Sequence, residues 1–362
     1  MSTRLSRYVK ICFFILTTTS VGGIIFFVFI KPPMIIVNEV RQGSRLGDQL
    51  AVYSSTKWFS YKYNIPLAVI PFKHYNELNL SQEPCWAELQ CFPMRLLCKL
   101  FGRVIDVHTE EDIINGLKTM HRPTRFVTSF RTHCPDIYTL AKQDKNFGKI
   151  LKNMLQPIAP INPLSLPKDR MTVAVHVRKG GGYDPELCAQ QYYDTQNKNN
   201  FTTASTPPPN TSPAADKMWP DKFPPEQFYV DQIKRLKTLL GDAKLFVYVF
   251  TDDKHPQQLT ERIKNHVCDN TITFSCKADN YSYKSHVIED FAAMLQFDCL
   301  IRSGSGFPYM VQFAGNFKIT LYLENLHWQD DTTLIIDKVG MTIDKNALAK
   351  RLALLKNTPF KK

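Results

Sequence analysis

Short apolar runs alternate with longer amphipathic segments along most of the chain. The short runs predict buried strands at 34–40, 66–71, 171–177, 245–250, 298–302 and 318–324. Segments with one apolar side predict helices at 51–64, 225–240, from Pro256 onward, at 285–297 and at 344–356. This alternation is typical of an α/β fold with parallel sheets, which binds its ligands at the carboxyl ends of the strands.

The same pattern divides the chain. Residues 156–168 hold four prolines and predict a linker between an N-terminal α/β domain at 31–165 and a C-terminal Rossmann-like domain at 169–350. Within the second domain, residues 185–225 contain eight prolines and runs of Asn and Thr. This composition predicts a surface insertion without a core of its own.

The amino terminus carries a candidate membrane anchor. Residues 11–30 are uncharged and long enough to cross a bilayer as a helix. Arg4, Arg7 and Lys10 precede them, and the positive-inside rule then keeps residues 1–10 in the cytosol. A cleaved signal peptide is the alternative, but its apolar core is only about 7–15 residues long. We expect an uncleaved signal anchor and a type II membrane protein, with its main part in the secretory lumen, such as the Golgi apparatus, in a eukaryote.

Composition narrows the choice of ligand. The 362-residue chain has a net charge of +12, which favours anionic ligands, but it lacks the long basic runs and modules typical of nucleic-acid binding. Its nine cysteines form no CxxC pair or Cys/His cluster, so we expect no structural zinc. Four Asn-x-Ser/Thr sequons are consistent with a secreted glycoprotein and begin at Asn79, Asn200, Asn210 and Asn280.

The strand at 171–177 leads into residues suited to binding an anion. Arg178 and Lys179 supply charge and directed donors, and the three glycines after them let backbone approach a ligand without Cβ atoms in the way. His176 alternates with the buried valines beside it. We expect it to be a hydrogen-bonded packing residue that orients this donor-binding loop rather than a base.

Two further loops would meet this one at the same sheet edge. They carry Asp252 and Asp253 after the strand at 245–250, and Ser303, Gly304 and Ser305 directly before a helix. Hydroxyls and amides at a helix N-terminus can hold a phosphate opposite Arg178, while a carboxylate can accept from a guanine or a ribose. Together the three loops predict a sugar-nucleotide pocket.

Four segments resemble the motifs of the fucosyltransferase superfamily, and they occur along the chain in the same order as in that family. HVRKGGGYD at 176–184 is similar to the HxRRGDY motif of the α1,2-fucosyltransferases and to the HVRR segment of the α1,6- and protein O-fucosyltransferases. The other three segments lie at 43–69, 247–253 and 288–315. The resemblance implies a GT-B type fold of two Rossmann-like domains, a GDP-fucose donor, inversion at the sugar carbon, and no metal or other cofactor.

The resemblance also implies a role for individual residues. Arg178 would contact the β-phosphate of GDP, with Lys179 in the place of a second arginine. The remaining donor contacts would be Asp252 or Asp253 with guanosine, Ser303 and Ser305 with the phosphates, and Gly43 and Gly47 shaping the first loop. The acceptor hydroxyl also needs a base. Asp184 and Glu186 lie where α1,6-type relatives place a carboxylate, and we prefer Glu186.

Two other functions remain open. The Asp252–Asp253 pair also fits the metal site of a GT-A glycosyltransferase that uses another nucleotide-sugar donor. Lys179, Gly181 and Asp48 depart from the family pattern, which fits a catalytically silent, membrane-anchored protein that binds a sugar or nucleotide. In each case we expect acceptor specificity to reside in the first domain and in the insertion at 185–225.

Overall fold

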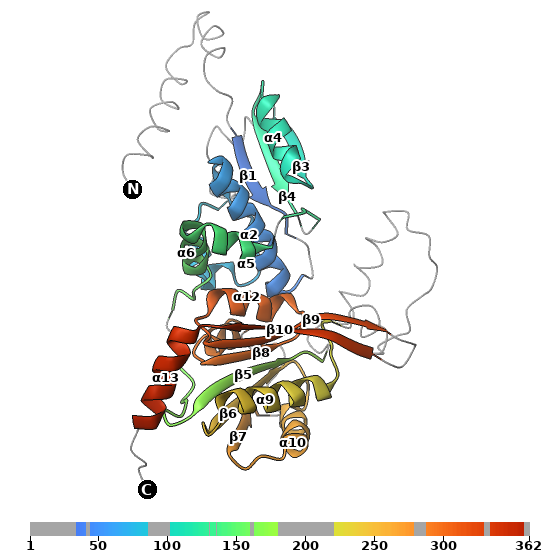
Figure 1. The fold of residues 1–362 in the computed structure, drawn as a ribbon. Helices are drawn as coiled ribbons and strands as arrows, with labels where there is room; N and C mark the ends of the chain where they lie inside the picture. Colours follow the sequence, from blue (N-terminus) through green and yellow to red (C-terminus); the bar gives the residue numbers. More distant parts are fainter. Residues whose placement is uncertain are drawn as a thin grey trace, which may run out of the picture. The chain divides into compact units, whose positions relative to one another are not determined.

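The fold consists of two compact units (Figure 1). A computed structural model describes residues 34–40, 44–85, 102–129, 131–134, 136–159, 163–179, 221–278, 287–328 and 334–357. The first unit comprises Met1–Val40, Val52–Phe72 and Ser81–Leu151, and the second comprises Arg41–Ala51, Lys73–Leu80 and Lys152–Lys362. The start of helix α2 (Leu46–Tyr63) therefore belongs to the second unit, although most of this helix belongs to the first.

The first unit contains a four-stranded parallel sheet in the order β2-β1-β4-β3. Its strands are β1 (Met34–Asn38), β2 (Leu67–Ala68), β3 (Arg103–Val107) and β4 (Thr124–Thr128). Its helices, besides α2, include α4 (Glu110–Lys118), α5 (Ile137–Gln143) and α6 (Lys145–Met154), whose last residues pass into the second unit. Asp112 fixes the start of α4, because its carboxylate accepts the backbone N–H groups of His108 and Thr109, each at 2.8 Å.

The second unit contains a six-stranded sheet in the order β10-β9-β8-β5-β6-β7. Its strands are β5 (Met171–Val177), β6 (Leu245–Thr251), β7 (Ile272–Cys276), β8 (Cys299–Arg302), β9 (Ile319–Trp328) and β10 (Leu334–Ile343). All neighbouring strands are parallel except β9 and β10, which form an antiparallel hairpin. Apart from this last strand, the order is that of a doubly wound nucleotide-binding sheet.

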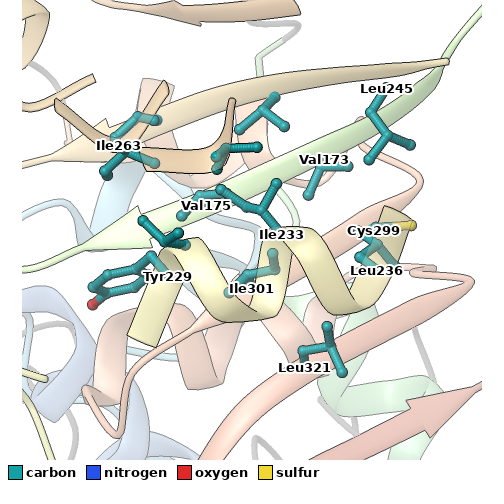
Figure 2. Packing of buried hydrophobic residues seen from close by; sticks show 14 of the residues in the cluster. Val173, Val175, Tyr229, Ile233, Leu236, Leu245, Ile263, Cys299, Ile301 and Leu321 are labelled. Carbon is teal, nitrogen blue, oxygen red and sulfur yellow. The ribbon is translucent and has the colours of Figure 1, made fainter. Parts of the chain in front are cut away.

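Helices α9 (Glu226–Leu240) and α10 (Pro256–Val267) pack on one face of this sheet. Figure 2 shows α9 presenting Ile233 and Leu236 to the valines of β5, Val173 and Val175. These residues are almost fully buried, as expected for alternate positions of a central strand. Helix α13 (Lys345–Asn357) adds leucines to the same core.

The opposite face is aromatic and carries α11 (Val287–Met294) and α12 (Gly306–Ala314). The rings of Phe291 on α11 and Phe307 on α12 have their centroids 5.9 Å apart. His176 of β5 packs against the same Phe307, with centroids 5.7 Å apart. In register with His176 are Phe250 of β6 and Arg302 of β8, so these three residues form a row at the end of this face.

The strand order reverses between β5 and β8. The crossover after β5 leads to β6 on one side, whereas β8 lies on the other side of β5. In doubly wound sheets such a switch point opens a crevice at the carboxyl ends of the two strands, and ligands bind there. Arg178 and Ser303 follow directly on these two strands.

The structure confirms the α/β class with parallel sheets and most of the predicted elements, but it corrects some details. The insertion predicted at 185–225 extends too far, because Pro224 is buried and Phe223 packs against Arg178. Strands β3, β4, β7 and β10 were missed, and the strand predicted at 66–71 is only two residues long. The predicted linker at 156–168 falls within the second unit, and the predicted domain boundary stays a prediction.

The predicted anchor at 11–30 lies outside the described residues. Within the described ranges, no helix is both long and apolar enough to span a membrane.

Candidate functional site

Arg178 lies at the centre of a cluster of charged and polar side chains at the switch point. It follows the last residue of β5, and only 8% of its surface is exposed. Its Nη1 donates to Ser305 Oγ at 3.0 Å, and its guanidinium carbon lies 5.1 Å from the centre of the Phe223 ring. The guanidinium is therefore held beside the N-terminus of α12, and its predicted contact with a phosphate stays a prediction.

Lys179 is engaged differently from the prediction of a second phosphate contact. Its ammonium donates to Glu226 on α9 at 2.8 Å. Arg262 of α10 binds both carboxylate oxygens of Glu226, at 2.9 and 3.1 Å. Hydrogen bonds from Arg262 and then from Lys179 lower the pKa of Glu226 to about 2. Lys179 thus shares the single carboxylate of Glu226 with Arg262, whereas Arg178 donates to the hydroxyl of Ser305.

Asp252 and Asp253 have different environments, although they are adjacent. Asp252 accepts the backbone N–H of Lys179 at 2.6 Å and Nη1 of Arg45 at 3.2 Å, so both of its oxygens are used. Asp253 accepts the backbone N–H of His255 at 2.8 Å, in a local turn before α10. Asp252 therefore ties Arg45 to the β5 loop, whereas Asp253 helps to begin a helix.

The Ser303–Ser305 loop is held tightly from two sides. Ser303 and Ser305 are buried, and the N–H of Gly304 donates to the carbonyl of Asp221 at 2.7 Å. A Cβ atom on Gly304 would lie 2.5 Å from Asp221 Oδ2. On the other side, a Cβ atom on Gly47 would lie 2.4 Å from the backbone nitrogen of Phe307. Glycine is needed at position 47, where the neighbour is backbone, whereas the neighbour of Gly304 is the side chain of Asp221.

Two further arginines, Arg45 and Arg302, act together with Arg178 on His176. Arg302, at the end of β8, is buried; its Nε donates to Gln312 Oε1 at 2.6 Å and its Nη1 to the Ser303 carbonyl at 3.0 Å. Desolvation, followed by the charges of Arg178, Arg45 and Arg302, lowers the pKa of His176 to about 3. The histidine therefore stays neutral at physiological pH. Its lowered pKa reflects the positive potential of the three guanidinium groups.

His176 is a packing residue, as predicted. Its ring packs on Phe307, and its buried Nδ1 has no hydrogen-bond partner in the part of the chain that the structure describes. A neutral imidazole with a solvent-shielded nitrogen is suited to a polar contact with a ligand rather than to charge stabilisation.

Tyr229 of α9 is a member of the site that sequence reasoning missed. Its hydroxyl lies next to Ser303 and the main chain of Arg178. Burial raises the pKa of this phenol above its ordinary value, and the nearby Asp252 acts in the same direction. The periodicity of α9 places Tyr229 among its core positions, so a pattern of apolar residues could not separate it from Phe228.

A small cavity lies on the aromatic face of the second unit and is bordered by Phe250, which is in register with His176. It measures about 130 Å³ and is lined by Leu164, Tyr248, Phe250, Lys277, Glu289, Asp290 and Ala293. Lys277 forms an ion pair with Asp290, and burial raises the pKa of the Asp290 carboxyl. Asp290 lies inside the segment that resembles the fucosyltransferases, but it was not selected as a site residue.

Three of the predicted site residues, Gly43, Asp184 and Glu186, lie outside the described residues. The others are all in the second unit, and most of them converge. Arg178, Ser303, Gly304 and Ser305 form the centre, His176 and Gly47 border it, and Asp252 braces it. Asp253 instead accepts the backbone N–H of His255 in the turn before α10, and Lys179 donates to Glu226.

Comparison with known proteins identifies similar folds at low sequence identity. No protein-family model and no curated protein sequence matches the chain. An Arg-to-Lys mutant of Arabidopsis thaliana FUT1 in complex with GDP is 12% identical, with a TM-score of 0.47 over 88% of this chain and 77% of that chain. POFUT1 in complex with GDP is 12% identical, with a TM-score of 0.39 over 79% and 96% of the two chains. The fucosyltransferase NodZ from Bradyrhizobium is 10% identical, with a TM-score of 0.42 over 87% and 99%. Likeness at this level assigns no activity to this chain.

Proposed function

We propose that this protein is an inverting glycosyltransferase that transfers fucose from GDP-fucose to a hydroxyl of a glycan acceptor. The observation that carries the proposal is the position of Arg178. A buried arginine is hydrogen-bonded to Ser305 at a helix N-terminus, at the switch point of a doubly wound sheet. This arrangement suits a diphosphate, because guanidinium, hydroxyls and helix amides all favour negative charge.

The same groups supply the chemistry that transfer needs. When the bond between the sugar carbon and the phosphate oxygen breaks, negative charge develops on the β-phosphate. Fixed cations and dipoles aimed at this oxygen stabilise the transition state without reorganising. Arg178 and Ser305 would meet the leaving phosphate, and Arg45 and Arg302 add to the positive potential around it.

We assign the nucleoside end of the donor to the cavity beside Asp290. A guanine presents two N–H donors that suit a carboxylate such as Asp290, which is paired with Lys277. Asp290 lines a cavity with two aromatic rings, Tyr248 and Phe250, which suit a planar base. Phe250 pairs in register with His176, so the row at the end of β5 would connect base and diphosphate.

We further propose that residues 11–30 anchor the protein as a type II membrane protein with its catalytic part in the secretory lumen. The support is the uncharged stretch itself and the basic residues before it, Arg4, Arg7 and Lys10. The glycan acceptors of such an enzyme occur in the same compartment.

Binding and turnover of the full chain in detergent test the proposal. We expect GDP and GDP-fucose to raise the midpoint of thermal unfolding, whereas UDP sugars should leave it unchanged. GDP-mannose carries the same nucleotide with another sugar, so comparing it with GDP-fucose distinguishes recognition of the nucleotide from recognition of the sugar. Arg178→Ala should lower transfer about 10²–10³-fold or more, as expected when a group that stabilises the developing charge is removed. Arg235→Ala on the exposed surface of α9 is the matched control and should behave as wild type.

Two results would overturn the proposal. Unchanged turnover in Arg178→Ala would remove its central residue. Binding of GDP without any hydrolysis or transfer of GDP-fucose would instead support the silent binding protein.

A further inference from the structure

A hairpin arm extends the second sheet past its carboxyl edge. β9 pairs with β8 only at residues 319–322, but it pairs with β10 along its whole length. Residues 323–328 and their partners 334–339 therefore continue beyond the end of β8, and Figure 1 shows β9 and β10 reaching past the other strands. This hairpin arm stands beside the loop that follows β8, which contains Ser303 and Ser305.

The base of the hairpin arm borders a cavity of about 260 Å³. It is lined by Leu323, Glu324, Asn325 and Leu326 of β9, and by Asp221 from the segment before α9. Its volume is close to the lower end of the roughly 300–1,000 Å³ found for small-molecule sites. Apolar side chains with a few polar groups, here an amide and two carboxylates, are typical of small-molecule sites, in which the polar groups orient the ligand.

Asp221 connects this cavity to the anion site. Its carbonyl accepts the N–H of Gly304 at 2.7 Å, and its Oδ2 lies so close to Gly304 that a Cβ there would come within 2.5 Å. Among the described residues, no cation forms an ion pair with the Asp221 carboxylate. The other acid of the cavity, Glu324, is already paired with Lys338 at 2.7 Å. Asp221 is thus the carboxylate of this cavity that remains available to a ligand.

We propose that the cavity at the base of the hairpin arm is the acceptor subsite and that Asp221 is the catalytic base. This inference rests on the proposed function. In the reaction, the acceptor oxygen forms a bond to the sugar carbon of the donor, while its proton passes to Asp221. The bond from the sugar carbon to the phosphate oxygen breaks, and its electron pair leaves with the GDP held by Arg178. The donor supplies the leaving group and Asp221 takes the proton, so no further reactant is needed.

The charge of the cavity also defines the class of acceptor. Asp221 and Glu324 supply two carboxylates to its lining, and Lys338 balances one of them. A sialylated or sulfated sugar would bring further negative charge next to Asp221, which is unfavourable in a partly enclosed site. The acceptor is therefore a neutral oligosaccharide that offers a free hydroxyl.

The test compares Asp221→Asn with wild type in the full chain. GDP affinity is measured by calorimetry, and fucose transfer is measured to two probes, a mixture of neutral N-glycans and the corresponding sialylated mixture. We expect Asp221→Asn to keep GDP affinity within about twofold and to lose about 10²–10⁴-fold in transfer rate, the usual contribution of a general base. Asp242→Asn, an exposed acid after α9, is the control and should transfer normally. In Asp221→Ala, added formate should restore part of the transfer rate, because a small carboxylate can enter the vacated space.

The outcomes separate this inference from the proposed function. If wild type binds no GDP, the proposed function fails and the inference fails with it. If wild type binds GDP and transfers fucose, but Asp221→Asn transfers at the same rate, only the inference is wrong. A loss confined to Glu186→Gln, a preference for sialylated glycans, or transfer to neither mixture would overturn it as well.

Discussion

At the residue scale, the pKa of His176 is strongly changed by its surroundings in this site. Its pKa is lowered to about 3 by desolvation and by the charges of Arg178, Arg45 and Arg302. The folded protein therefore keeps His176 neutral, whereas the unfolded chain takes up a proton below a pKa of about 6.5. Because the unfolded state binds more protons over this range, the free energy of unfolding must fall as the pH drops from about 6.5 towards 3.

This gives a prediction for His176→Gln. The substitution should remove a slope of up to about 1.4 kcal/mol per pH unit below pH 6, the value expected for one proton. Urea unfolding at pH 7, 6 and 5 measures the slope, which is independent of any constant change in stability. His121→Gln, at an exposed position, is the control and should keep the wild-type slope. If His176→Gln also kept it, the imidazole would not be held neutral.

At the residue scale, the sequence identified the main cation but not the state of its neighbours. Arg178 was predicted because a strand and a glycine run delimit it in the sequence. The pairing of Lys179 with Glu226, 47 residues away, and the separate tasks of Asp252 and Asp253 depend on contacts between elements. No local pattern encodes those contacts. Asp221 was missed for another reason, because it lies within the proline-rich tract at 185–225, which composition alone assigns to the surface.

At the scale of elements, the first turn of α2 packs very closely against the start of α12. Gly47 lies in the first turn of α2, and a Cβ there would lie 2.4 Å from the backbone nitrogen of Phe307. In an open helix, Gly→Ala would stabilise the fold by about 1 kcal/mol. Here backbone would have to shift, and overpacking typically costs about 1–3 kcal/mol, so the unfavourable effect wins.

We therefore expect Gly47→Ala to lower both stability and GDP affinity, because α12 begins at the proposed phosphate site. Thermal unfolding with and without GDP measures the two effects together. Gly306→Ala is the matched control on the other side of the contact, since its Cβ would lie at an ordinary 3.5 Å from Asp48. Equal stability of the two variants would show that the contact is not as tight as described.

The elements themselves were predictable where their patterns are strong. α9 has buried positions at helical spacing and ends at Gly241, whose φ of 59° suits glycine. β10 was missed because Asp337, Lys338 and Gly340 interrupt its apolar alternation, and a bulge lies between Ile336 and Val339. β10 is held by its pairing with β9, a tertiary interaction that the local sequence does not specify.

At the scale of the whole molecule, the net charge of +12 agrees in sign with the proposed ligand. The charge that matters is local, however, because Arg45, Arg178 and Arg302 act together on His176. The sequence predicted a sugar-nucleotide pocket from three loops, and the topology places those loops at one switch point. The proposed acceptor subsite was not predictable in this way, because the hairpin arm and Asp221 meet only in the folded unit.

The partners of the carboxylates at the site also favour one of two proposed mechanisms. A metal-dependent transferase would need carboxylates such as Asp252 and Asp253 to be available to a divalent cation. Asp252 is instead engaged by Arg45 and by the backbone of Lys179, and Asp253 by the turn before α10. Guanidinium groups and the N-terminus of α12 would then neutralise the diphosphate. We expect transfer from GDP-fucose to continue in excess EDTA within about twofold of the untreated rate, and to weaken as salt screens the cationic site. Loss of transfer in EDTA, restored by added Mn²⁺ or Mg²⁺, would instead favour the metal-dependent mechanism and require Asp252 to exchange its partners on binding.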